Sequence, residues 1–268
     1  ASGMVRGINF IIPGIWLVDS SFFMAANLNP VVIAHRGASY RFPEHTLKAY
    51  QSAVIDADGF ECDVRLLRDG NIICWHDATL SRTSNARGLV ANQTWEKIQG
   101  IDAGSWHRSK TFQPPLIFND LLELAKQNGK SISIETKHPV PSGGAIEYRL
   151  AELLPIISST NDAARADFRL MSFSLLAVLK WKKLRPDIPA VYLLDKRPLN
   201  FLPNCEVIGP GISRVRRDPK LVKSLQARGY QVHVWTVDTA EDIDLCLELG
   251  VNAIITNKPD EVRARISG

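Results

Sequence analysis

The feature that most constrains the fold is a regular alternation of short apolar runs with segments of helical periodicity. Eight runs are rich in β-branched or apolar residues, as buried strands are: 31–34, 60–64, 132–135, 168–173, 190–194, 206–209, 231–236 and 252–256. Helical patterns fill most of the gaps: 46–56, 175–184, 219–229 and 239–250. Alternating strands and helices predict a parallel sheet.

A parallel sheet of this kind is either open and doubly wound or closed into a barrel. No Gly-rich phosphate fingerprint follows the first run, and eight β–α units match a (β/α)8, or TIM, barrel. We therefore predict a single TIM-barrel domain over residues 31–268. The gap at about 77–115 is longer than an ordinary connection and predicts a small insertion after the second barrel strand, with a returning helix at 116–127.

Residues 71–76 form a further apolar run that follows the second barrel strand very closely. Only residues 68–70 separate the two runs, which suits an antiparallel hairpin and not a parallel crossover. If Asp69-Gly70 is the turn, counting along the ladder places His76 opposite Asp63. The hairpin is thus predicted to bring a histidine beside a carboxylate.

Three carboxylates are predicted to share the barrel interior. Glu61 and Asp63 are two apart on one strand, so both point to the same face, and Glu135 ends the next barrel strand. Buried carboxylates require a compensating cation. Hard oxygen ligands without a thiolate favour one divalent cation, Mg²⁺ or Ca²⁺. Zinc bound with a histidine, or a metal-free ion-pair network with Arg65, are the alternatives.

Two histidines are predicted at the barrel mouth. His35 lies at the C-terminal end of the first strand, where barrel enzymes place catalytic groups, and His76 is the second. A lone histidine there is more often structural. Two histidines that flank an acidic cluster favour a role in proton transfer, because imidazole exchanges protons near neutral pH.

These residues belong to short motifs that follow one another along the chain: His35-Arg36-Gly37-Ala38, Pro43-Glu44-His45-Thr46, Glu61-x-Asp63, His76-Asp77, Asp102-Ala103-Gly104-Ser105-Trp106, Glu135-x-Lys137 and Trp235-Thr236. Their order and spacing, over roughly residues 31–260, resemble the glycerophosphodiester phosphodiesterase family. Asparagine is usual in that family where this chain has His45. We expect His45 to face solvent, with a third titrating group or a weak ligand as the alternatives.

The resemblance implies a role for each residue of the constellation. Members of the family cleave glycerophosphodiesters to glycerol 3-phosphate and an alcohol. By resemblance, His35 and His76 are the acid/base pair, Glu61, Asp63 and Glu135 bind the metal, and Arg36 and Lys137 contact the phosphate. Trp235 is a candidate to pack on the substrate, with core filling as the alternative. A cyclic phosphate is a plausible intermediate, because glycerol carries a hydroxyl next to its ester.

Two other functions fit similar residues. A lysophospholipase D or sphingomyelinase D-like enzyme uses a similar site on a lipid. An inactive phosphoester-binding module would keep the pocket, although it has no need of two proton-transfer groups. A serine hydrolase is disfavoured because the G-x-S-x-G motif is absent.

The composition indicates which binding partners and which cellular compartment to expect. The net charge is only +4, without a run of Lys and Arg interleaved with aromatics, so we expect a small-molecule substrate and no nucleic acid. Four cysteines without a C-x-x-C pair favour a reducing compartment, the cytoplasm.

Residues 1–30 form an N-terminal extension outside the barrel, in which residues 1–3 resemble a tag remnant. The apolar stretch 8–18 keeps two alternatives open, a secreted or periplasmic location and contact with a membrane surface. No segment reaches the ~20 apolar residues of a transmembrane helix.

Overall fold

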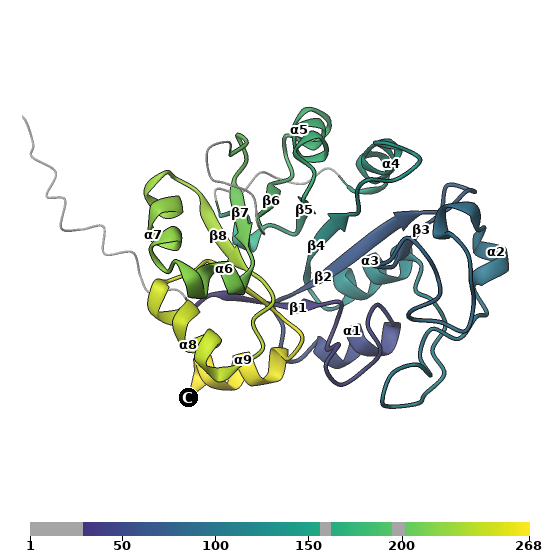
Figure 1. Ribbon diagram of the computed structural model, residues 1–268, viewed down its shortest axis with the longest axis horizontal. Coiled ribbons are helices and arrows are strands. Elements are labelled where there is room, and N and C mark those ends of the chain that lie inside the picture. The colour runs from purple at the N-terminus through teal and green to yellow at the C-terminus, as the bar shows by residue number, and fades with distance from the viewer. Residues whose placement is uncertain (1–28, 156–161, 195–201) are drawn as a thin grey trace, which may run out of the picture.

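The computed structural model describes residues 29–155, 162–194 and 202–268, and within them the strands close into a barrel (Figure 1). The barrel strands are β1 (Val31–His35), β2 (Gly59–Leu66), β4 (Ser131–Thr136), β5 (Phe168–Ser172), β6 (Ala190–Leu194), β7 (Val207–Pro210), β8 (Gln231–Val234) and β9 (Ala253–Thr256). Neighbours run parallel, and β1 closes the ring by pairing with both β9 and β2. The predicted TIM barrel and its eight strands are confirmed.

Helices cover the outside of the barrel (Figure 1). They are α1 (Leu47–Ala53), α3 (Phe118–Gln127), α4 (Ala145–Leu153), α5 (Leu175–Leu184), α6 (Ile212–Arg217), α7 (Lys220–Ala227), α8 (Ala240–Leu249) and α9 (Pro259–Ser267). Local sequence sets several ends, since the Thr46 and Ser174 side chains cap α1 and α5, and Gly250 ends α8 with a φ of +65°.

Because successive side chains of a strand point to opposite faces of the sheet, the barrel has two apolar layers. One set of side chains, such as Ile33, Val191 and Ile255, fills the barrel interior. The other set, such as Val32 and Ile254, packs between the sheet and the helices. Glu61 and Asp63 follow the interior parity, so they point into the barrel as predicted.

The insertion packs as a small satellite of the barrel. Between β3 (Ile72–Cys74) and α3 it contains a 3-10 turn (Val90–Asn92) and the short helix α2 (Trp95–Ile98). Its apolar side chains, including Trp75 and Leu80, form a cluster of their own. The insertion therefore holds its shape through a local core next to the barrel mouth.

The hairpin between β2 and β3 is antiparallel as predicted, but the predicted register is wrong by one residue. Residues 68–70 form a three-residue turn in which Gly70 has a φ of +85°, in place of a two-residue turn. The Trp75 N–H donates to the carbonyl of Asp63 at 2.8 Å, so Trp75 and not His76 lies opposite Asp63. His76 follows the end of the strand and still reaches the barrel mouth.

Arg169 holds the lower part of the barrel together. It is fully buried on β5 and donates to the hydroxyls of Ser131 and Ser133 and to the carbonyls of Ala163, Ala164 and Ala166. We expect Arg169→Met to lower the free energy of unfolding by about 1–3 kcal/mol, because these acceptors lose their buried donor. Urea unfolding measures this. Arg165→Met, at a half-exposed neighbour, is the control, and equal losses in both variants would contradict the assignment.

The expectations for the N-terminal extension fall almost wholly on residues 1–28, outside the described part of the chain. Among the described helices, none is long and apolar enough to cross a membrane.

Candidate active site

The three predicted carboxylates meet at the barrel mouth. Asp63 on β2 pairs in register with Glu135 on β4, and Glu61 lies two residues before Asp63. All three are buried, and each offers an oxygen within 4.8 Å of the others. The strand alternation that points them inward also makes them neighbours, so the cluster follows directly from the barrel.

Two cations of the chain lie against this cluster. The Arg36 guanidinium Nε is 3.0 Å from Asp63 Oδ2, and the Lys137 Nζ is 2.7 Å from Asp63 Oδ1. Lys137 also contacts Glu135 Oε1 at 2.6 Å. The backbone N–H of Arg36 donates to Glu61 Oε2 at 3.0 Å. Asp63 therefore takes most of the positive charge that the protein supplies.

The remaining carboxylates are short of positive charge. Burial and the nearby Asp63 charge raise the pKa of Glu61 well above its usual range and that of Glu135 to about 8. Burial would raise the pKa of Asp63 too, but Arg36 holds it well below its usual value. Glu61 Oε1 is buried and has no hydrogen-bond partner within the described ranges. Charge, oxygen chemistry and spacing together fit a hard divalent cation.

His35 is oriented from behind by an amide. Its Nδ1 lies 2.7 Å from Asn257 Oδ1, and the Asn257 amide nitrogen donates to Asp238 at 2.6 Å. An amide oxygen only accepts, so Nδ1 carries the proton and Nε2 has a free lone pair. This Nε2 lies 3.8 Å from Glu61 Oε2. Burial, reinforced by Arg36, lowers the pKa of His35 to about 3, so His35 is neutral near pH 7.

His76 is oriented by a carboxylate. Its Nδ1 lies 2.6 Å from Asp77 Oδ1, and Arg82 Nε fixes Asp77 at 2.7 Å. Burial lowers the pKa of His76, whereas the charge of Asp63 opposes that shift. His76, Glu135 and Lys137 line a cavity of about 370 Å³. The second histidine thus faces the acidic cluster with its Nε2 available.

His45 does not face solvent, and that expectation is wrong. The residue is only 4% exposed, and its Nε2 lies 2.9 Å from Asp63 Oδ2. Its Nδ1 is 3.0 Å from the hydroxyl of Tyr50, which donates to the backbone carbonyl of Glu61. A φ of +60° at His45 directs the ring inward, toward a charged partner that only the closed barrel brings near.

Trp235 stands apart from the other predicted site residues. Its indole N–H donates to the carbonyl of Gly209 at 2.7 Å, and its ring meets Phe173 edge-on with centroids 5.4 Å apart. Phe173 lines the cavity that holds His76. The structure therefore brings seven predicted residues together, His35, Arg36, Glu61, Asp63, His76, Glu135 and Lys137, and places Trp235 against Phe173.

Asn257, Asp238, Tyr50 and Arg82 support the site but were not predicted. Asn257 directly follows the predicted strand 252–256, at the end of a strand where barrel enzymes place functional residues, and this position is the signal that points to it. The others reach the site through contacts of the folded chain: Tyr50 with His45 and Glu61, Arg82 with Asp77 and Glu44, and Asp238 with Asn257.

Comparison with known proteins identifies the family of this barrel. The model of the glycerophosphoryl diester phosphodiesterase family matches residues 35–261. The chain belongs to this family.

Individual relatives with the family's activity in their names are similar to this chain over most of its length. A Mycobacterium tuberculosis protein named "Probable glycerophosphodiester phosphodiesterase 1" is 38% identical, covering 88% of this chain and 92% of that protein. The Bacillus subtilis glycerophosphodiester phosphodiesterase is 30% identical over 86% of this chain and 84% of its own. A solved Oleispira antarctica phosphodiesterase in complex with the product sn-glycerol-3-phosphate has a TM-score of 0.75 and 25% identity, covering 89% of this chain and 97% of that one.

Proposed function

We propose that this chain hydrolyses glycerophosphodiesters to glycerol 3-phosphate and an alcohol. The observation that carries the proposal is the meeting of three buried carboxylates, two cations and two oriented histidines at one barrel mouth. A phosphodiester needs charge neutralisation, an activated oxygen and a proton for the leaving group, and each task has a candidate here. The product named for the Oleispira relative supports the same reaction.

Glu61, Asp63 and Glu135 would hold one divalent cation, for which Mg²⁺ and Ca²⁺ suit the all-oxygen set. Such a cation neutralises phosphate charge and lowers the pKa of a bound hydroxyl. Arg36 and Lys137 add donors toward the equatorial phosphate oxygens. Both already contact Asp63, so they are positioned before substrate arrives.

The histidines divide the proton transfers between them. His35 is neutral, with a free Nε2 beside Glu61, and it takes the proton of the attacking hydroxyl, either the neighbouring hydroxyl of glycerol or water. His76 donates from Nδ1 to the Asp77 carboxylate, a hydrogen bond that opposes the lowering of its pKa by burial, and it gives a proton to the leaving alkoxide. His35 is thus the base and His76 the acid.

The test is release of glycerol 3-phosphate from glycerophosphocholine and glycerophosphoethanolamine with Mg²⁺, Ca²⁺ or EDTA. We expect release with a divalent cation and none in EDTA. Release that persists unchanged in EDTA would contradict the cation's role, and saturable binding without release under any metal would favour a binding module.

His45 is expected to position Asp63. Loss of a residue that orients a ligand typically costs 10–100-fold, so His45→Ala should lower kcat/KM by about that factor and weaken Ca²⁺ binding in calorimetry. His45→Asn, which restores the residue usual in the family and keeps a donor, should stay within about threefold. Equal losses in both variants would indicate a packing role only.

The free cysteines agree with the proposed cytoplasmic location. All four, Cys62, Cys74, Cys205 and Cys246, are buried and unpaired. A reducing compartment keeps such thiols in this state.

A further inference from the structure

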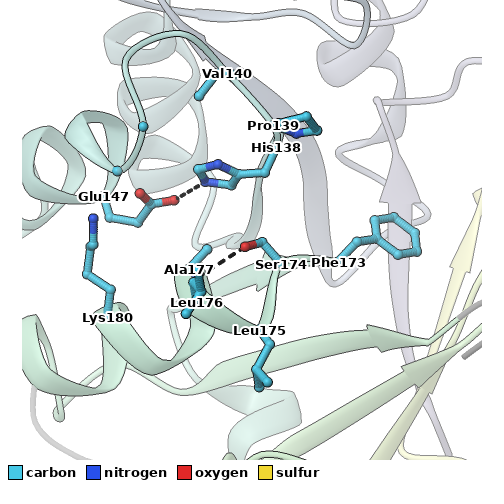
Figure 2. Close-up of a pocket in the computed structure, with 12 residues that line it drawn as sticks. His138, Pro139, Val140, Glu147, Phe173, Ser174, Leu175, Leu176, Ala177 and Lys180 are labelled. Atoms are coloured by element: carbon cyan, nitrogen blue, oxygen red, sulfur yellow. Dashed lines mark hydrogen bonds and ion pairs between the residues drawn. The ribbon is translucent and has the colours of Figure 1, made fainter. Parts of the chain in front are cut away.

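A large cavity adjoins the active site on the side of the leaving alcohol. In the proposed function this alcohol takes its proton from His76, which lines a cavity of about 370 Å³. His138 and Phe173 line both this cavity and a larger one of about 540 Å³. The larger cavity lies between the segment after β4 and the start of α5 (Figure 2). A leaving alcohol that extends past His138 therefore enters it.

The wall of the larger cavity contains a buried carboxylate with one unpartnered oxygen. Glu147 lies in the first turn of α4 and is fully buried. Its Oε1 is 2.6 Å from His138 Nε2, as Figure 2 shows, whereas Oε2 has no hydrogen-bond partner among the described residues. Leaving a buried acceptor without a donor costs free energy, so this oxygen indicates a ligand that supplies an N–H or O–H group.

His138 extends this carboxylate toward the ligand. A carboxylate accepts and does not donate, so His138 donates from Nε2 and its neutral ring keeps a lone pair on Nδ1. The wall thus combines an accepting ring nitrogen with the negative charge of Glu147. Hydrogen bonds to an ionised group are stronger when the donor is also charged, so the pair favours an ammonium over a hydroxyl.

A cation of the chain lines the same cavity. Lys180 Nζ lies against Gly144, where any side chain would collide with it, and 5.2 Å from the centroid of the exposed Tyr148 ring. Within the described ranges of the chain, no carboxylate forms an ion pair with this ammonium. The cavity therefore offers both a carboxylate that lacks a donor and an ammonium that lacks a counter-charge.

Other leaving alcohols match these two groups less well. The quaternary ammonium of choline has no N–H to donate to Glu147, and ethanolamine leaves Lys180 without a partner. An uncharged polyol pairs with neither charge, and the side chains of Pro139, Val140 and Leu175 offer it no hydrogen bonds. An alcohol that carries both an ammonium and a carboxylate matches both groups.

We propose that this cavity binds the leaving alcohol and selects an amino-acid alcohol, of which serine is the simplest. Glu147 and His138 contact its ammonium, and Lys180 contacts its carboxylate. The proposal rests on the proposed function. In glycerophosphoserine the bond between phosphorus and the serine oxygen breaks, water supplies hydroxyl to phosphorus, and serine receives the proton. The products are glycerol 3-phosphate and serine, and no further reactant is required.

The test compares kcat/KM for three diesters: glycerophosphoserine, glycerophosphoethanolamine and glycerophosphopropanol, in which a methyl group replaces the ammonium. We expect glycerophosphoethanolamine to exceed glycerophosphopropanol by about 10–100-fold, because a hydrogen bond to a charged group contributes most. Glycerophosphoserine should exceed glycerophosphoethanolamine by about two- to fivefold, since Lys180 is only half-buried and its ion pair is weaker. Equal values for all three diesters would overturn the proposal.

Two variants each remove one charge and keep the size of the side chain. Glu147→Gln should reduce the preference for ethanolamine over propanol to within about threefold. Lys180→Met should remove the preference for serine over ethanolamine and keep the preference for ethanolamine over propanol. Glu152→Gln on α4 and Lys183→Met on α5 make the same charge changes outside the cavity, so they should keep both preferences.

The two variants can fail independently. An unchanged preference in a folded Glu147→Gln would show that His138 already neutralises Glu147, and this would overturn the ammonium contact. If Glu147→Gln unfolds, Lys180→Met still tests the cavity, because this half-buried side chain lies outside the core. Loss of the serine preference in Lys183→Met as well as in Lys180→Met would overturn the carboxylate contact.

A binding measurement separates this proposal from the activity. Calorimetry in EDTA, where no turnover is expected, compares the affinities of the same three diesters. Tighter binding of glycerophosphoserine than of glycerophosphopropanol, reduced in Lys180→Met, supports the cavity even if no diester is hydrolysed. Equal affinities contradict the cavity even if glycerophosphocholine is a good substrate.

Discussion

Glu61→Gln is expected to abolish turnover and, at the same time, to stabilise the metal-free protein. The two effects have one cause. Burial and the Asp63 charge raise the pKa of Glu61, which means that its ionised form is disfavoured in the folded chain. In the proposed function that negative charge holds a cation, and it costs folding free energy when no cation is bound. Stability and function therefore compete at this residue.

The expected changes in kcat and in the free energy of unfolding are both large enough to measure. Losing a ligand of a cation that supplies several kcal/mol of charge stabilisation should lower kcat by at least about 10³-fold. The free energy of unfolding in EDTA should rise by about 1–2 kcal/mol, as at other residues held against stability. Urea unfolding with and without Ca²⁺ checks the second effect, and the gain should disappear when the cation is present.

Glu44→Gln provides the opposite control. Burial would raise the pKa of Glu44, but hydrogen bonds from Arg82 and the charge of Arg36 lower it to about 2. Its charge therefore stabilises the fold, and Glu44→Gln should lower the free energy of unfolding. A stability loss in Glu61→Gln as well would show that Glu61 is a structural ion-pair partner and not a cation ligand.

The barrel could be predicted because each strand carries its own signal. Buried parallel strands are apolar on both faces, so the eight runs stand out from the helices between them. The length of the β2–β3 turn was harder to predict. The sequence 68–70 is compatible with a two-residue or a three-residue turn, and the positive φ of Gly70 selects the second. One turn residue moved Trp75 into the place expected for His76.

The carboxylate cluster was predictable for the same local reason. Glu61 and Asp63 share a face whatever else the fold does, and a barrel places Glu135 on the adjoining strand. His45 had no such local signal. It precedes α1 in a loop, and nothing near it in sequence indicates that its partner is Asp63, which comes within reach only through the packing of that loop into the barrel mouth.

The orientation of the histidines cannot be predicted from their neighbours in the sequence. His35 and Asn257 are 222 positions apart, and closure of β9 onto β1 alone makes them partners. That contact fixes which ring nitrogen carries the proton. The sequence predicted two proton-transfer groups, whereas the proposed assignment of base and acid needed the hydrogen bonds of the folded chain.

This assignment leads to the sharpest kinetic expectation. His35→Ala and His76→Ala should each lower kcat by about 10²–10⁴-fold on glycerophosphocholine, the usual contribution of a general acid or base. A substrate with a p-nitrophenol leaving group needs no proton on departure. On that substrate His76→Ala should lose less than about tenfold, while His35→Ala keeps its full loss.

Steady-state kinetics on the two substrates therefore distinguishes the roles. Asp244→Ala is the control, because this exposed residue of α8 pairs with Arg265 and lines neither cavity of the site, and its turnover should match that of the unmodified chain. The reverse pattern, with His35→Ala rescued by the better leaving group, would exchange the roles of base and acid. It would also mean that the neutral state of His35, which burial and Arg36 impose on the metal-free chain, does not persist in the complex with substrate.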